Sequence, residues 1–204
     1  MKPEDAPNLV NNPIGWSRSA IITATFGALW GAWGSAGLGR PGILLWVFIL
    51  VGALLVAFGV RQVSRLRALG LPPVASPFRF PAYRYAVLFE AVAIPIACLW
   101  LVRERRYDLL APVTALIVGL HFIGLAKAFH SRRYIGVCAA MVLLAAGTVV
   151  LLPAVGNGRS PVHIWLLVTG WGCAAILWAV TVQNLWRARR YDTGPATAST
   201  AQLK

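Results

Sequence analysis

The sequence predicts an all-α integral membrane protein, a six-transmembrane-helix bundle with both termini in the cytoplasm. Composition is the first observation behind this prediction: 58% of the 204 residues are hydrophobic and only 12% are charged, whereas soluble domains carry about 25% charged residues. The second is a set of six separate apolar windows, each close to the ~20 residues that an α-helix needs to cross a bilayer. The third is the gathering of basic residues in alternate loops.

The apolar windows define the expected helices and leave little chain for a soluble domain. They cover roughly 16–38, 42–60, 82–102, 109–129, 134–152 and 162–186. They are too long for strands and lack strict polar and apolar alternation. We expect a flexible cytoplasmic N-terminus over 1–13, the transmembrane domain over 14–190 and a small, polar, disordered tail over 191–204. The first residues do not resemble a secretory signal, so the first helix is expected to be retained.

The basic residues predict the orientation of the bundle. If the loops alternate sides, 14 of the 19 Lys and Arg fall on the side of the termini and five on the other side. By the positive-inside rule the termini are therefore cytoplasmic. The 16 arginines against three lysines, with abundant Ala and Gly, are typical of a bacterial genome rich in G and C. We expect a multi-pass protein of the bacterial inner membrane, and the net charge of +13, spread over loops, does not indicate nucleic-acid binding.

The first two helices carry small residues at four-residue spacing. Gly27, Gly31 and Ser35 share one face of the first helix, and Ala53 and Ala57 share one face of the second. Small faces let membrane helices approach closely. The sequence leaves open whether these contacts form within one chain or between protomers, so a homo-oligomer through the Gly27, Gly31 and Ser35 face is one expected partner.

The loop between the second and third helices, residues 61–82, is basic and rich in proline. We expect the second helix to continue to about Leu69, where Gly70 ends it. The loop is then an interfacial anchor beside anionic lipid, or a docking site for a partner.

The third helix contains the only carboxylate that is placed deep in an apolar window, Glu90, followed by Pro95. Glu90 lies about eight residues, or about 12 Å, inside the membrane. A carboxylate there costs a few kcal/mol and usually faces protein or a wet cavity. Pro95 frees the carbonyl of Ala91 and predicts a kink with a polar gap beside Glu90.

The fourth helix supplies a partner for this carboxylate. Glu90 and His121 lie about 15 residues on either side of the centre of a short loop, so two antiparallel helices place them at equal depth. Both lie on faces of small residues, which predicts that they meet inside the bundle. Thr23 of the first helix falls at a similar depth and is expected to add a hydroxyl to a proton or substrate site made of Glu90, His121, Thr23 and Pro95.

Such a pair has two interpretations. Removal from water favours the neutral forms of a carboxyl and of an imidazole, and two groups in contact titrate as one unit, which suits proton coupling. The alternative is that the pair only fixes the packing of two helices, and that Pro95 bends the chain for packing reasons.

The sequence indicates neither a cofactor nor a catalytic centre. Cys98, Cys138 and Cys173 lie in different apolar segments without CxxC spacing, and His121 and His130 are nine residues apart, on opposite faces of a helix. No HExxH, GxSxG or phosphate-binding glycine loop is present. The string RERRYD recurs as RARRYD, at 103–108 and 187–192, which is either a coincidence or the trace of a three-plus-three repeat.

The stretch IVGLHFIGLAKAFH, residues 117–130, preceded by a helix that contains Glu, resembles segments of small uncharacterised bacterial multi-pass membrane proteins. The resemblance covers mainly residues 83–133. It implies that this region is one unit and carries no known activity.

The expected function is a small inner-membrane transport or permeation protein, coupled to protons through Glu90 and His121, with a small-molecule or ion substrate. The alternative is a membrane scaffold or assembly partner that transports nothing, in which the pair only sets helix packing. A water-reachable cavity leading to Glu90 favours transport, and a dry, buried pair favours the scaffold.

Overall fold

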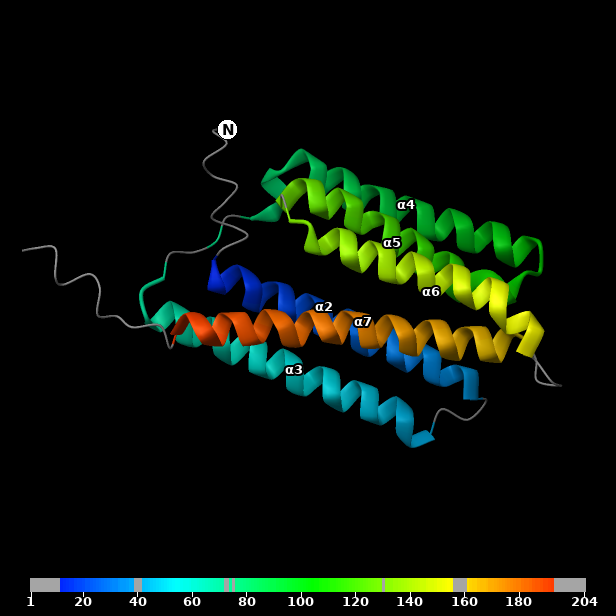
Figure 1. Ribbon diagram of the computed structural model, residues 1–204, viewed down its shortest axis with the longest axis horizontal. Coiled ribbons are helices and arrows are strands. Elements are labelled where there is room, and N and C mark those ends of the chain that lie inside the picture. The colour runs from blue at the N-terminus through cyan, green and yellow to red at the C-terminus, as the bar shows by residue number, and fades with distance from the viewer. Residues whose placement is uncertain are drawn as a thin grey trace, which may run out of the picture.

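The computed structural model describes residues 12–38, 42–71, 74, 76–129, 131–155 and 161–192, and it is helical throughout (Figure 1). Its long helices are α2 (Pro13–Ser35), α3 (Gly42–Ala68), α4 (Pro81–Arg103), α5 (Leu110–Phe129), α6 (Arg133–Val155) and α7 (Pro161–Asp192). Three short 3₁₀ turns are η2 (Ala36–Leu38), η3 (Pro77–Arg79) and η4 (Tyr107–Leu109). The all-α class is therefore confirmed for the described residues, and most of 1–13 and 191–204 lies outside them.

Five of these helices, α3 to α7, are long and apolar enough to cross a bilayer. The chain is accordingly a multi-pass α-helical membrane protein. Helix α2 is 23 residues long but is not among the five. Nearly half of its residues are buried by neighbouring helices, including Ser17, Thr23 and Ser35. Because protein rather than lipid covers these residues, polar and small side chains are tolerated along this helix.

The helices run up and down and form two groups (Figure 1). In one group α2 packs extensively against both α3 and α7; in the other α5 packs against both α4 and α6. Packing of α7 on α6 and α5 joins the two groups. The main core lies at this junction, where Phe122, Met141, Cys173 and Leu177 are buried together. We refer below to the α2–α3–α7 group and the α4–α5–α6 group.

Glycines allow the helix backbones of the α2–α3–α7 group to touch. A methyl group on Gly170 of α7 would lie 2.7 Å from the backbone nitrogen of Gly34 and 2.8 Å from the carbonyl oxygen of Trp30. Gly52 and Gly59 of α3 likewise pack directly on α2. The sequence instead singled out Ala53 and Ala57, which are exposed. The contact with α2 within this chain follows the seven-residue spacing of Gly52 and Gly59, and the packing role of Ala53 and Ala57 stays a prediction for contacts between protomers.

The small-residue face of α2 is filled within one chain. Gly27 packs against the ring of Trp178 on α7, and Gly31 against the ring of Phe48 on α3. Ser35 is fully buried and donates a hydrogen bond of 2.8 Å to the carbonyl of Gly31. A homo-oligomer formed through this face would have to displace these contacts.

Local sequence signals mark the start of α2 and the end of α3. The side chain of Asn12 accepts a hydrogen bond from Ile14 at the start of α2, with Pro13 in the first position, as N-cap preferences predict. Gly70, at φ +79°, ends α3. Bonds of 2.9 Å from Gly70 to Arg67 and 3.3 Å from Leu71 to Leu66 complete a Schellman motif.

Basic residues gather at one end of the bundle. The ends of α3, α5 and α7 lie there together with the starts of α2, α4 and α6 (Figure 1). Within the described residues this end holds Arg18, Arg61, Arg65, Arg67, Arg79, Arg84, Lys127, Arg132, Arg133, Arg187, Arg189 and Arg190, and the opposite end holds Arg103, Arg105 and Arg106.

The two copies of the recurring string adopt different structures. In the first copy Arg105 is left-handed, at φ +56°, and Arg106 forms a two-point contact with Asp108, at 3.2 and 3.3 Å. The second copy continues helix α7 to Asp192, with the Arg190 guanidinium 3.5 Å from the centre of the Trp186 ring. The copies differ in local structure but lie at opposite ends of the bundle, where an inverted repeat would also place them, so the coincidence and the repeat both stay open.

Candidate functional site

The candidate site lies where α4 and α5 approach most closely. A methyl group on Gly124 of α5 would lie 2.5 Å from the Cβ of Ala86 on α4. One turn deeper along each helix, His121 Nδ1 lies 3.2 Å from Glu90 Oε2. The close approach that the depth argument predicts is therefore confirmed, while the role of the pair stays a prediction.

The imidazole has a second partner on α4. His121 Nδ1 lies 2.9 Å from the carbonyl oxygen of Ala86, which also accepts the helical bond from the backbone of Glu90. A carbonyl oxygen can only accept, so this contact is a hydrogen bond when Nδ1 carries the hydrogen. Ala86 therefore favours the Nδ1–H tautomer, and that hydrogen is shared between Ala86 and Glu90.

The opposite edge of the imidazole is open. Nε2 of His121 has no hydrogen-bond partner among the described residues. Unlike the polar side-chain atoms that are fully buried without a partner, it is not enclosed by protein. The side chain of His121 is only 9% exposed and that of Glu90 is 25% exposed. The neutral ring thus presents one acceptor nitrogen to the surface while its other nitrogen holds α4.

Aromatic rings cover the pair on the side of the basic end. Tyr83 of α4 packs edge-on against Phe129, and Phe122 stacks on Tyr134. Tyr83 lies within electrostatic reach of the Glu90 carboxylate. The pair is thus continuous with a cluster of phenol and phenyl rings that connects α4, α5 and α6.

The other two predicted site residues lie away from the pair. Thr23 is bonded to Thr181 of α7, with the two hydroxyl oxygens 2.7 Å apart. The prediction that Thr23 lies beside Glu90 was wrong. The two residues lie at a similar depth in the membrane, but α2 packs against α3 and α7 and not against α4. Pro95 lies on an exposed face inside a continuous α4 and contributes no atom to the Glu90–His121 contact.

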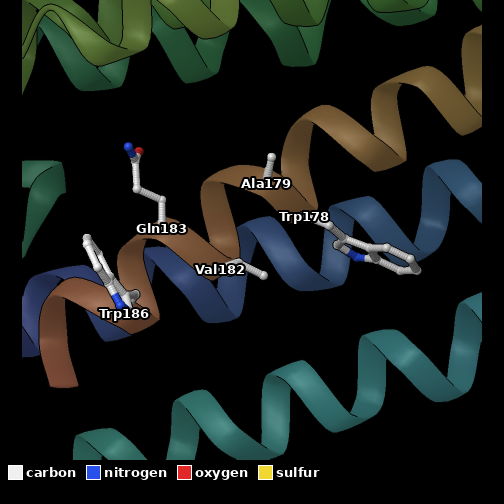
Figure 2. Close-up of a pocket in the computed structure, with 5 residues that line it drawn as sticks. All are labelled: Trp178, Ala179, Val182, Gln183 and Trp186. Carbon is white, nitrogen blue, oxygen red and sulfur yellow. The ribbon is translucent and has the colours of Figure 1, made fainter.

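Two shallow surface grooves are the best-formed hollows in the described part of the chain. One, of about 640 Å³, runs along α7 between Trp178 and Trp186. Figure 2 shows Gln183 extending from it toward the α4–α5–α6 group, and Trp178 lying against α2. The other, of about 470 Å³, lies between α4 and α5, and His121 is part of its wall.

This arrangement can bind and pass a proton, because it joins a carboxylate to an imidazole whose far nitrogen is open. Within the described segments no group of three His, Cys, Asp or Glu side chains is close enough to hold a metal ion. The chemistry that the geometry offers is therefore hydrogen bonding and proton transfer.

Together, the apolar helices and the buried polar pair define the chain as a multi-pass membrane protein with an ionisable site between two of its spans. Comparison with protein-family models, curated proteins and solved structures finds no match. The resemblance to small bacterial membrane proteins stays a prediction.

One contact in the site was missed from sequence, the backbone carbonyl of Ala86. A signal for it exists, because the residue four positions before a helical carboxylate presents its carbonyl on the same face. The sequence contains no signal for the exposure of Nε2, because that exposure depends on how closely α4 and α5 approach at Gly124.

Proposed function

We propose that the chain is a small bacterial inner-membrane transport protein in which Glu90 and His121 bind and release a proton. The observation that supports this most directly is the 3.2 Å contact between Nδ1 and Oε2 inside two membrane-spanning helices. Ionisable residues at such positions mark ion and proton paths.

The geometry suggests how a proton would move. A proton that binds Nε2 of His121 makes the ring an imidazolium, and the Nδ1 hydrogen can then pass to Oε2 of Glu90. The carboxylate becomes a carboxyl and the ring becomes neutral again, so charge and hydrogens balance. The lone pair of Nδ1 would then face the Ala86 oxygen, 2.9 Å away. This repulsion drives the hydrogen back and keeps the exchange reversible.

The proposal includes six crossings, with both termini in the cytoplasm. Two observations support α2 as a crossing: it lies beside α3 and α7 over its length (Figure 1), and its polar residues Ser17, Thr23 and Ser35 are covered by protein. The gathering of basic residues at the end where the described chain begins and finishes supports the orientation.

Proton flux across proteoliposomes tests the role of the pair. Wild-type vesicles with an entrapped pH indicator should respond to an imposed pH gradient faster than protein-free vesicles. Glu90→Gln keeps shape and hydrogen bonding but cannot titrate, so it should reduce the flux to the protein-free level. Glu104→Gln is the matched control, because Glu104 is exposed at the end of α4, and it should behave like wild type.

Equal flux in wild-type and Glu90→Gln vesicles would refute a proton role, provided that both proteins melt at similar temperatures. Wild-type flux no greater than that of protein-free vesicles would refute proton transport altogether.

A second candidate, a membrane scaffold, is favoured by one observation. Only Ala86 and Leu101 of α4 are buried, so the contacts of His121 with Ala86 and Glu90 contribute much of what holds this helix to α5. In a scaffold the pair would act as a clamp alone. Glu90→Gln would then lower the melting temperature and change no flux.

A further inference from the structure

The groove between α4 and α5 has the properties of a lipid site. Tyr85 and Phe89 form its α4 wall, Leu120 and Ile123 its α5 wall, and the close contact of Gly124 with Ala86 its floor. The wall residues are well exposed, Tyr85 at 71% and Phe89 at 45%. The volume of about 470 Å³ falls in the range of about 300–1,000 Å³ that is common for ligand sites.

The two ends of this groove differ in charge. Lys127, at the basic end, is part of the lining, and its side chain has no ion-pair or hydrogen-bond partner among the described residues. The deeper end, at Leu120 and Phe89, is apolar apart from the open edge of His121.

The other groove lacks this gradient. Its lining contains aromatic and aliphatic side chains with the amide of Gln183, and no cation. Near its basic end Arg190 stacks on Trp186, Arg189 lies 5.2 Å from the centre of the Phe58 ring, and Arg187 has a buried Nη1. A cation among the lining residues is therefore a feature of the α4–α5 groove and not of this one.

We infer that the α4–α5 groove binds one anionic phospholipid. Its phosphate lies beside Lys127 at the membrane surface, and one acyl chain lies on Gly124 between Phe89 and Ile123. His121 is six residues, or about 9 Å, deeper than Lys127, so the acyl chain passes over its open Nε2 edge. The inference does not depend on the proposed transport, in which a proton reaches Nε2 only while the acyl chain is displaced from that edge.

Photo-crosslinking tests this inference. The protein is reconstituted in phosphatidylcholine with a small fraction of phosphatidylglycerol that carries a diazirine in one acyl chain, and adducts are mapped by mass spectrometry. Adducts should concentrate on Phe89 and Ile123 over Leu50 and Leu54 of α3, although the two leucines are more exposed. The same probe with a phosphocholine headgroup should show no such concentration.

Charge variants complete the test. Lys127→Gln should lower groove labelling about five-fold, corresponding to ~1 kcal/mol per basic residue near anionic lipid. Arg61→Gln on α3 is the matched control and should leave the labelling unchanged, because Arg61 is an exposed cation at the same end of the bundle. Even labelling of all exposed helices, equal labelling by both headgroups, or insensitivity to Lys127 would each overturn the inference.

Discussion

The α2–α3–α7 group and the α4–α5–α6 group hold their helices together in different ways. In the first, glycines bring backbones into direct contact, as at Gly170 and Gly34, and nearly half of α2 is buried. In the second, α4 buries only Ala86 and Leu101 and is tied to α5 by the contacts of His121. The outer helices α3 and α4 are equally sparse in buried residues, at 11% of the apolar window of each, so the groups differ in the kind of contact that holds them.

This difference teaches where a membrane bundle can place an ionisable pair. Between α2 and α7, the contact of Gly170 with Gly34 leaves no space for a carboxylate and an imidazole. Between α4 and α5, the pair lies one turn deeper than the glycine contact at Gly124 and adds polar contacts to it.

Filling the backbone contact of the first group should have the largest effect. Gly170→Ala places a methyl group on the backbone of α2, where no side chain can move aside. Overpacking costs about 1–3 kcal/mol and occasionally more, and we expect the upper end or beyond. Unfolding in mixed detergent and SDS micelles should show a large loss of stability, or no folded protein.

Gly147→Ala is the control for this prediction. Gly147 lies in α6 with no atom within 4 Å of an added methyl group, so alanine should be neutral or stabilise the helix by up to about 1 kcal/mol. If Gly170→Ala unfolds no more readily than Gly147→Ala, the contrast between the two groups is wrong.

Breaking the polar clamp of the second group should have the next largest effect. A double-mutant cycle of Glu90→Leu, which removes the acceptor oxygens, and His121→Phe should give a coupling of about 1–1.7 kcal/mol, at the upper end of interhelical polar contacts. The reason is that the ring and the carboxylate meet with little other packing to hold α4. Hydrogen exchange of α4 amides should rise in both single variants, and a coupling near zero would contradict the clamp.

The sequence predicted those features that depend on distance along one helix or across one short loop. All six long helices fall on the apolar windows, Gly70 ends α3, and the hairpin of α4 and α5 sets Glu90 level with His121. Thr23 was misplaced because depth does not say which helices are neighbours. On α3, small residues recur at both four-residue and seven-residue spacing, and packing against α2 shows that Gly52 and Gly59 form the contact within the chain.

Relief of backbone strain after α4 should give a smaller effect of opposite sign. Arg105 occupies the left-handed region at φ +56°, in a Schellman motif in which Arg106 bonds to the carbonyl of Leu101 at 2.8 Å. Left-handed geometry costs a residue with a Cβ about 1–2 kcal/mol. Arg105→Gly should therefore raise the unfolding free energy by about 1 kcal/mol, and an unchanged or lower melting temperature would show that the arginine side chain contributes more than the strain costs.

The smallest expected effect concerns the polar contact of the first group, between Thr23 and Thr181. The hydroxyl oxygens lie 2.7 Å apart, but each also lies 3.0 Å from a carbonyl of its own helix, those of Ser19 and Leu177. When either threonine becomes valine, the remaining hydroxyl can still donate to its own carbonyl, so no donor is left unpaired. A Thr23→Val and Thr181→Val cycle should give a coupling of about 0.6 kcal/mol, below that of Glu90 with His121. A coupling equal to or larger than that of the Glu90–His121 pair would mean that the α2–α3–α7 group also depends on a polar clamp, and that glycine contacts alone do not distinguish the two groups.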